Sequence, residues 1–237
     1  MNAQPRTEAA VDELARIESV PFTARDLPSS TYDLIARTTR SHHDRPALHL
    51  LPGGRHWDQP ETWSYGELLR RVNQAANLYA ALGLEPGGVV GLMLPNAGTT
   101  YSALFGAQVI GIANPVNPML ATEHIIDIFR LTGARVLVAP APELDAGMWR
   151  KACAVAAALP GVRVLISVGR VVEHAPSEWV GDFDELAATQ PEEPTFDRRP
   201  GPADTAAYFH TGGTTGTPKV ARNLSNPVRP VRPRILC

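Results

Sequence analysis

Cysteine is scarce in this sequence of 237 residues, and its scarcity excludes several classes of protein. The chain has two cysteines, Cys153 and Cys237, which are too few for a disulfide-stapled scaffold or a cysteine-ligated metal centre. Cys153 lies in an apolar stretch with helical periodicity, which favours a core position over a nucleophile. Because 44% of the residues are apolar and 19% are charged, an ordinary hydrophobic core is expected.

Long hydrophobic runs and a charge excess are also lacking. No run of about 18 apolar residues occurs, so no transmembrane segment is expected. Residues 1–20 have no apolar core of the signal-peptide type, and the expected location is therefore the cytoplasm. The 24 acidic and 22 basic residues give a net charge of −2, which provides no general attraction to nucleic acid or to an anionic membrane.

The sequence does contain alternating helical and strand patterns, which predict βαβ units and an α/β fold with a mostly parallel sheet. Helices are expected at 11–17, 31–39, 65–82, 99–110, 122–132, 149–159 and 183–188. Strands are expected at 47–50, 61–63, 89–94, 136–139, 162–167 and 206–209. The first two strands are predicted to pair with each other across a longer hairpin loop, and the two prolines of A-N-P-V-N-P at 113–118 predict a loop.

The helix at 65–82 has the strongest local signals. Ser64 and Glu67 have the spacing of a capping box, and Gly83 is a typical helix terminator. The apolar residues that recur at helical spacing predict a buried stripe made of Leu68, Val72, Ala75, Ala76, Tyr79 and Leu82.

A loop rich in glycine and threonine carries the main functional signal. Residues 208–221 read Y-F-H-T-G-G-T-T-G-T-P-K-V-A and follow an apolar strand. Glycine lets successive backbone N–H groups approach an anion, and threonine hydroxyls and a lysine add further donors. The pattern is neither G-x-x-x-x-G-K-[ST] nor G-x-G-x-x-G, and the alternative is an ordinary turn. The predicted phosphate-binding residues are Thr211, Gly212, Gly213, Thr214, Thr215, Gly216, Thr217 and Lys219.

The run T-G-G-T-T-G-T-P-K resembles the phosphate-binding loop of the AMP-forming adenylate synthetases. The preceding Y-F-H and the glycine at Gly212 resemble the acyl-CoA synthetase branch. T-W-S-Y-G-E-L at 62–68 and I-G-I-A-N-P-V-N-P at 110–118 also resemble this superfamily. The resemblance implies the N-terminal part of the large adenylate-forming domain, incomplete at its C-terminus, with ATP, Mg and CoA as cofactors. It implies a ligase that activates a small-molecule carboxylate, and the branch that the loop resembles suggests a medium- or long-chain fatty acid.

The resemblance also assigns roles to residues. The eight loop residues would hold the β- and γ-phosphates of ATP, and Lys219 would offset charge on the leaving pyrophosphate. Tyr208 and Phe209 are expected to position the loop by packing, whereas His210 is expected either to face the acyl or nucleotide site or to be structural. The catalytic lysine of the family lies beyond this chain, so no catalytic residue and no metal ligand is predicted.

Residues 222–237 depart from the family pattern. They contain four arginines, three prolines and no acidic residue, which predicts polyproline structure or disorder. We expect a frameshifted or truncated reading frame and a chain that is inactive alone. The alternatives are a natural disordered tail, a basic arm for nucleic acid or lipid, a non-catalytic nucleotide-binding protein, and the non-functional product of a broken gene.

Five segments are expected from these observations. They are a polar N-terminal arm at 1–28, an α/β core at 29–168, a proline-rich surface connection at 169–204, the strand and phosphate loop of a next subdomain at 205–221, and a basic tail at 222–237. If later residues completed the sheet around 206–210, this strand would be an exposed edge here.

Overall fold

A computed structural model describes residues 5–21, 24–51, 60–172, 175–211, 219–225 and 235–236. The helices are α1 (Pro5–Ser19), α2 (Thr31–His42), α3 (Tyr65–Ala81), α4 (Gly98–Ile110), α5 (Thr122–Thr132), α6 (Pro142–Ala158) and α7 (Phe183–Ala188). The strands are β1 (Pro46–Leu50), β2 (Glu61–Ser64), β3 (Val89–Leu92), β4 (Ile112–Pro115), β5 (Ala134–Pro140), β6 (Val164–Val168), β7 (Trp179–Asp182), β8 (Thr205–Thr211), β9 (Lys219–Leu224) and β10 (Ile235–Leu236).

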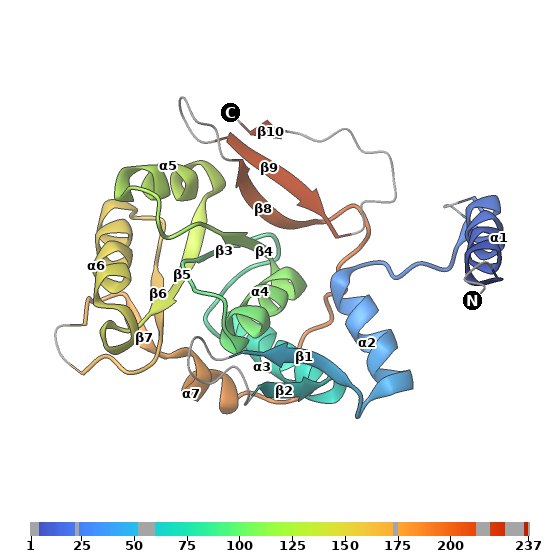
Figure 1. The fold of residues 1–237 in the computed structure, drawn as a ribbon. Coiled ribbons are helices and arrows are strands. Elements are labelled where there is room, and N and C mark those ends of the chain that lie inside the picture. The colour runs from blue at the N-terminus through green and yellow to red at the C-terminus, as the bar shows by residue number, and fades with distance from the viewer. Residues whose placement is uncertain are drawn as a thin grey trace.

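The main sheet confirms the predicted α/β architecture. Its strand order is β10-β9-β8-β4-β3-β5-β6-β7, and it is parallel from β8 to β7. Strands β8, β9 and β10 pair antiparallel, while β1 and β2 form a separate antiparallel pair, as predicted. Figure 1 shows α5 and α6 on one side of the sheet and α3, α4 and α7 on the other.

At the centre of the main sheet both faces are buried, and successive strand residues point into cores on opposite sides. Val90 and Leu92 of β3 belong to the core cluster that includes α3 and α4. Val89 belongs to a second cluster that includes α5 and α6. The near-continuous apolar runs of these strands follow from burial on both faces.

Helix α3 begins as the sequence predicts, with the Ser64 hydroxyl accepting a hydrogen bond from the Glu67 backbone N–H at 3.1 Å. The Glu67 carboxylate pairs with Arg71 at 2.9 Å. The predicted stripe is buried in the core, with Leu82 packed against it in part. Gly83, which follows the helix, has a φ of 79°, in the left-handed region that glycine adopts without strain.

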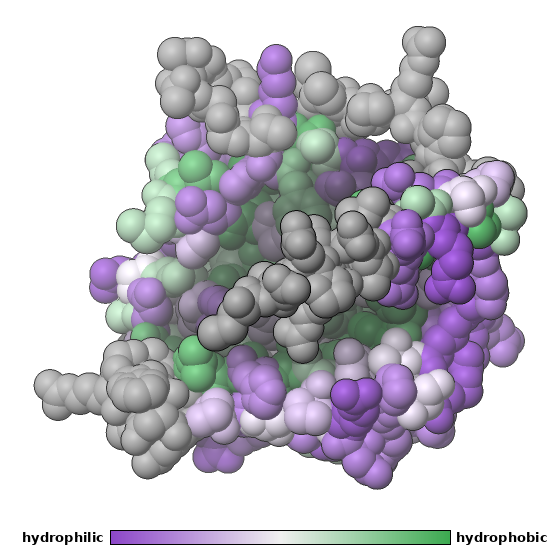
Figure 2. All heavy atoms as spheres, turned by 45° about the vertical axis from the view of Figure 1, so that its right-hand side comes forward, coloured by the Kyte–Doolittle hydropathy of each residue, from purple (hydrophilic) through white to green (hydrophobic). Residues whose placement is uncertain are grey.

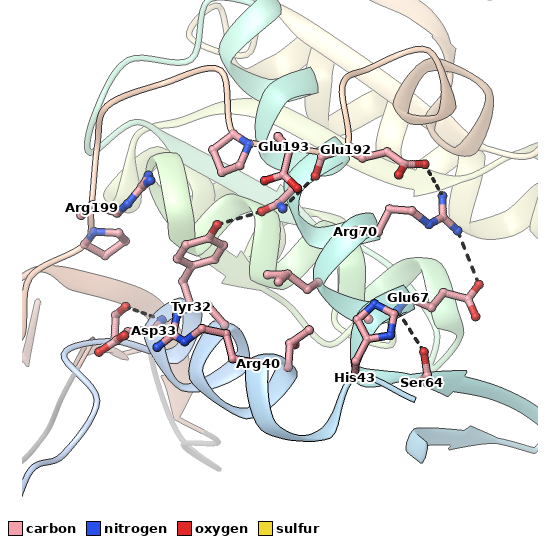
Figure 3. Close-up of a pocket in the computed structure, with 18 of the residues that line it drawn as sticks. Tyr32, Asp33, Arg40, His43, Ser64, Glu67, Arg70, Glu192, Glu193 and Arg199 are labelled. Carbon is pink, nitrogen blue, oxygen red and sulfur yellow. Dashed lines mark hydrogen bonds and ion pairs between the residues drawn. The ribbon is translucent and has the colours of Figure 1, made fainter. Parts of the chain in front are cut away.

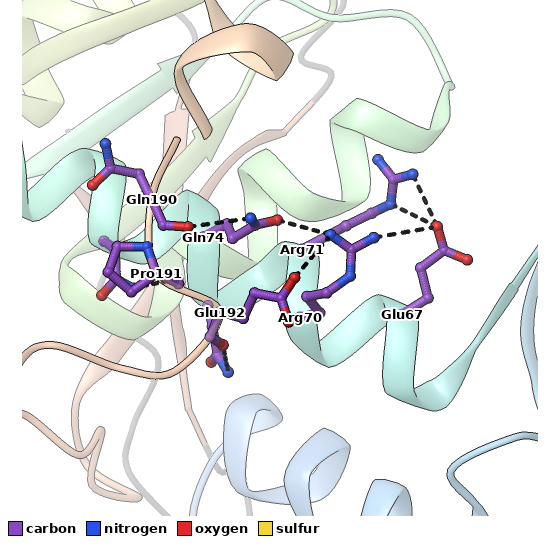
Figure 4. Close-up of polar contacts among 9 residues, drawn as sticks. Glu67, Arg70, Arg71, Gln74, Gln190, Pro191 and Glu192 are labelled. Atoms are coloured by element: carbon purple, nitrogen blue, oxygen red, sulfur yellow. Dashed lines mark hydrogen bonds and ion pairs between the residues drawn. The ribbon is translucent and has the colours of Figure 1, made fainter. Parts of the chain in front are cut away.

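A second, polar face of α3 is buried as well, and the sequence did not predict this. Asn73, Gln74 and Asn77 donate hydrogen bonds to backbone carbonyls of residues 190–193. Figure 4 shows this segment lying along α3, with the Arg70 guanidinium 3.7 Å from the carboxylate of Glu192. Residues 190–195, which we call the strap, are therefore fixed to the helix.

Several boundaries differ from the predictions. The predicted loop at 113–118 begins inside β4, which accepts Pro115 because a strand end tolerates a missing N–H. Helix α6 is kinked at Asp145, whose φ of −157° and ψ of 93° are not helical, and a first turn that begins with Pro142 precedes the predicted start at residue 149. The N-cap of α5 is Ala121, and its side chain makes no capping bond.

Two segments predicted to be irregular contain strands. The proline-rich connection includes β7, which pairs with β6, as well as the predicted helix α7. The tail continues the strand β9 through Arg222 to Leu224, because these residues pair with β8. Strand β8 itself lies between β4 and β9, so it is not an edge of the sheet.

Candidate functional site

The two ends of the glycine- and threonine-rich loop lie opposite each other. Thr211 is the last residue of β8, Lys219 is the first residue of β9, and the two are paired in the antiparallel register. Strand pairing therefore closes the loop at its base, and the Lys219 side chain is exposed there. The other predicted binding residues, Gly212, Gly213, Thr214, Thr215, Gly216 and Thr217, lie outside the described residues.

The strand that leads into the loop is held mainly from one face. Tyr208 packs against the core cluster of α5 and α6. Phe209 points to the opposite face and leaves 43% of its surface exposed. Tyr208 is therefore packed against the core beside the loop, whereas Phe209 is exposed, and their role in positioning the loop stays a prediction.

The seam between β4 and β8 depends on a buried side chain. Backbone register pairs the strands at Ala113 and Ala207, and Pro115 has no N–H to extend the ladder. The fully buried Asn114 side chain donates from Nδ2 to the Tyr208 carbonyl at 3.1 Å. Its Oδ1 accepts from the Thr132 hydroxyl of α5 at 2.7 Å, so one amide connects β4, β8 and α5.

His210 makes a further connection immediately before the loop. Its Nε2 accepts a hydrogen bond from the Asn117 backbone N–H at 3.0 Å. Because an accepting nitrogen carries no proton, the neutral imidazole has its proton on Nδ1. Partial burial lowers the pKa of His210 below its usual value, which favours this neutral form.

The turn that contacts His210 is itself well fixed. The Asn117 side-chain oxygen accepts from the Met119 N–H at 2.9 Å. Lys151 of α6 donates from Nζ to the Pro118 carbonyl at 2.7 Å and to the Leu120 carbonyl at 2.9 Å. Residues 116–120, which we call the β4 turn, are therefore anchored to α6. The sequence signal for these contacts is the pair of Asn-Pro dipeptides at 114–115 and 117–118, each of which places a polar side chain next to a proline.

The described part of this site holds one basic side chain, Lys219, at the base of the loop. The anion-binding role of the loop stays a prediction from its sequence. A metal centre has no support in the described ranges, where no group of three His, Cys, Asp or Glu side chains is arranged to hold an ion. Likewise, no described helix is long and apolar enough to cross a membrane.

A separate polar pocket of about 1270 Å³ lies between α2, the start of α3 and residues 192–200. Figure 3 shows acidic and basic side chains from these elements around it. Arg70 pairs with both Glu67 and Glu192 at 3.7 Å, and the Tyr32 hydroxyl donates to Asn73 at 3.0 Å. Asp33, Glu67, Arg70 and Glu192 of its lining form ion pairs within the protein, and the described lining does not include Lys219.

His43 borders this pocket, and neither it nor the adjacent His42 belongs to a group of three possible metal ligands among the described residues. His42 ends α2, and the exposed His43 lies with its Nδ1 2.7 Å from the Asp44 carboxylate. Figure 2 shows hydrophobic residues at the floor of a hollow and hydrophilic residues along its right-hand side.

Comparison with known proteins gives consistent results. Residues 35–222 match the family described as AMP-binding enzyme. The marinolic acid–CoA ligase of Pseudoalteromonas sp. (strain SANK 73390) is 34% identical over 213 residues, which are 90% of this chain and 32% of that protein. The crotonobetaine/carnitine–CoA ligase of Salmonella arizonae is 32% identical over 159 residues, covering 66% of this chain and 29% of that protein.

The fold is also similar to solved structures. The anthranilate CoA ligase AuaEII, in complex with anthranoyl-AMP, has a TM-score of 0.70 at 22% identity, covering 87% of this chain and 36% of that chain. Mycobacterium smegmatis MbtA in its apo form has a TM-score of 0.69 at 25% identity, covering 84% and 34%. The chain thus spans about a third of the length of these relatives.

Proposed function

The chain belongs to the family of AMP-binding enzymes, in the branch of the acyl-CoA ligases, and from this premise we propose that residues 211–219 hold the β- and γ-phosphates of ATP during activation of a carboxylate. The observation that carries the proposal is the pairing of Thr211 with Lys219 at the base of the loop. This pairing brings a lysine to the point where a strand, a loop rich in glycine and threonine, and a second strand meet.

The proposed reaction has two steps. A carboxylate oxygen attacks the α-phosphorus of ATP, and the bond to pyrophosphate breaks to give an acyl-adenylate. The thiolate of CoA then attacks the acyl carbon and releases AMP. The role proposed for Lys219 is to offset the charge that develops on pyrophosphate, because an electrostatic contribution is largest where charge increases in the transition state. Mg, when bound with ATP, would supply further neutralisation, and none of the residues described here is assigned as its ligand.

The acid substrate is proposed by class only. The relatives are named for marinolic acid, for crotonobetaine or carnitine, and for anthranilate, which share a carboxylate and little else. We therefore propose a small-molecule carboxylate, with ATP and CoA as the other substrates.

A binding experiment tests the phosphate site directly. We expect the Lys219→Gln variant to bind Mg·ATP about ten- to a hundredfold more weakly, because a charge-assisted contact is lost. Isothermal titration calorimetry of the purified chain measures this. The control is Arg150→Gln, which removes one positive charge from an exposed position on α6. Equal affinities of the two variants would contradict the assignment of Lys219.

The activity of these 237 residues by themselves is a separate part of the proposal. We propose that they do not catalyse adenylation alone, because positioning of both the α-phosphate and the carboxylate is needed and the chain spans only about a third of its relatives' length. Carboxylate-dependent ATP–pyrophosphate exchange by the purified chain would refute this. Binding of ATP without exchange would agree with it.

A further inference from the structure

We propose that His210 is a positioning residue for the phosphate loop, which it places by docking the end of β8 on the β4 turn. The inference rests on the proposed binding of ATP phosphates at this loop. His210 lies next to the loop. From the sequence, its side chain could either face the acyl or nucleotide site or have a structural role.

The contact joins parts of the chain that are far apart. His210 and Asn117 are separated by 93 residues, and Asn117 directs its backbone N–H at the imidazole rather than at a strand carbonyl. Asn114, three residues earlier, reaches β8 through its side chain. Two side-chain contacts therefore supplement the backbone pairing at the end of the seam that leads to Thr211.

The partner of His210 is a fixed support. Lys151 makes two hydrogen bonds to the β4 turn, and the Val116 N–H donates to the Leu92 carbonyl of β3 at 3.0 Å. The turn is therefore tied to both α6 and β3. A strand end attached to such a turn has a defined position relative to the sheet, and Thr211 is the next residue.

The chemistry of the contact needs an acceptor at the imidazole Nε2. Glutamine can present its side-chain oxygen at a similar distance from the backbone, whereas leucine has a similar volume but no acceptor. His210→Gln should therefore retain docking and His210→Leu should lose it. His124→Leu is the matched control, because His124 is exposed on α5.

Two measurements on the purified chain test the inference. In nitrogen-15 NMR spectra we expect His210 to be the neutral tautomer protonated on Nδ1. We expect hydrogen exchange of the Asn117 amide to accelerate at least fivefold in His210→Leu, with changed amide shifts at Thr211 and Lys219, and to stay near the parent value in His210→Gln and His124→Leu. By calorimetry, Mg·ATP affinity should fall about fivefold in His210→Leu alone, the loss expected for one hydrogen bond.

The outcomes separate the two proposals. If the parent chain binds no Mg·ATP, the proposed function fails, whereas the NMR changes at Thr211 and Lys219 still decide whether His210 positions the base of the loop. If His210→Leu leaves these shifts and the Asn117 exchange unchanged, the positioning role is overturned. Loss of binding in His210→Gln as well as in His210→Leu would also overturn it, since the acceptor would then not be the property that matters.

Discussion

At the scale of single residues, the polar side chains buried by this fold have more structural consequence than its surface charges. Asn77 is 2% exposed and uses its whole amide: Nδ2 donates to the Pro191 and Glu193 carbonyls, and Oδ1 accepts from the Thr195 backbone and hydroxyl. Buried polar groups of this kind are costly to leave unpaired. By contrast, the ion pair of Arg130 with Asp127 is largely exposed and contributes little.

We expect Asn77→Ala to lower the free energy of unfolding by about 3 kcal/mol, because several backbone groups of the strap lose their partner together. Urea denaturation followed by circular dichroism measures the change. The control is Asn223→Ala, at an exposed position of β9, which should lie within about 0.5 kcal/mol of the parent. If Asn77→Ala also lies within about 0.5 kcal/mol of the parent, the strap contacts add no measurable stability.

At the scale of secondary-structure elements, the C-terminal end of α5 needs a particular backbone conformation, and this need is independent of side-chain packing. Gly133 ends α5 with a φ of 73°, and a Cβ atom added there would have no neighbour within 4 Å. The position therefore requires glycine for its conformation and not for space.

Gly133→Ala should destabilise the chain by about 1 kcal/mol, since alanine must adopt the left-handed conformation. Gly201→Ala is the matched control, because the nearest atom to its Cβ would be 3.9 Å away and its φ lies outside the left-handed region. That variant should be neutral or slightly more stable, because alanine restricts the unfolded chain. Thermal unfolding of the two variants distinguishes them, and a Gly133→Ala melting temperature at or above that of Gly201→Ala would contradict the argument.

At the scale of the whole molecule, protection from solvent should follow the layers of the fold. Strands β3 and β5 lie at the centre of the main sheet with helices on both sides (Figure 1), and Val90, Leu137 and Val138 are fully buried. Strand β1 belongs to the separate two-stranded pair and has no fully buried residue. Local opening requires less loss of contacts in β1 than in β3 or β5.

Native-state hydrogen exchange by mass spectrometry should therefore give β3 and β5 the slowest exchange and β1 a rate at least tenfold faster. Within the strap, the Thr195 amide should exchange slowly as well, because it donates a hydrogen bond to the buried Asn77 side chain at 3.0 Å. Exchange of β1 as slow as that of β3 would mean that the chain opens only as a single unit.

The sequence by itself determined the class of the fold, most of its elements and the family. The capped helix α3 and the buried strand β3 follow from local periodicity and end signals, which a short window of sequence contains. The predicted phosphate loop is likewise a local signal, because the run of glycine, threonine and lysine at 211–219 is contained in a short window of sequence. The binding role of these residues remains a prediction, since the structure describes Thr211 and Lys219 and not the residues between them.

Only the tertiary structure decided how distant polar residues are paired. The strap contacts of Asn77 span 114 to 118 residues, and the contact of Asn114 with Tyr208 spans 94. No local period encodes such a hydrogen bond, because an asparagine in the sequence is equally compatible with a turn, a cap or a buried partner. The positions of β7 and β8 in the sheet were decided in the same way, by partners that meet only when the chain has folded.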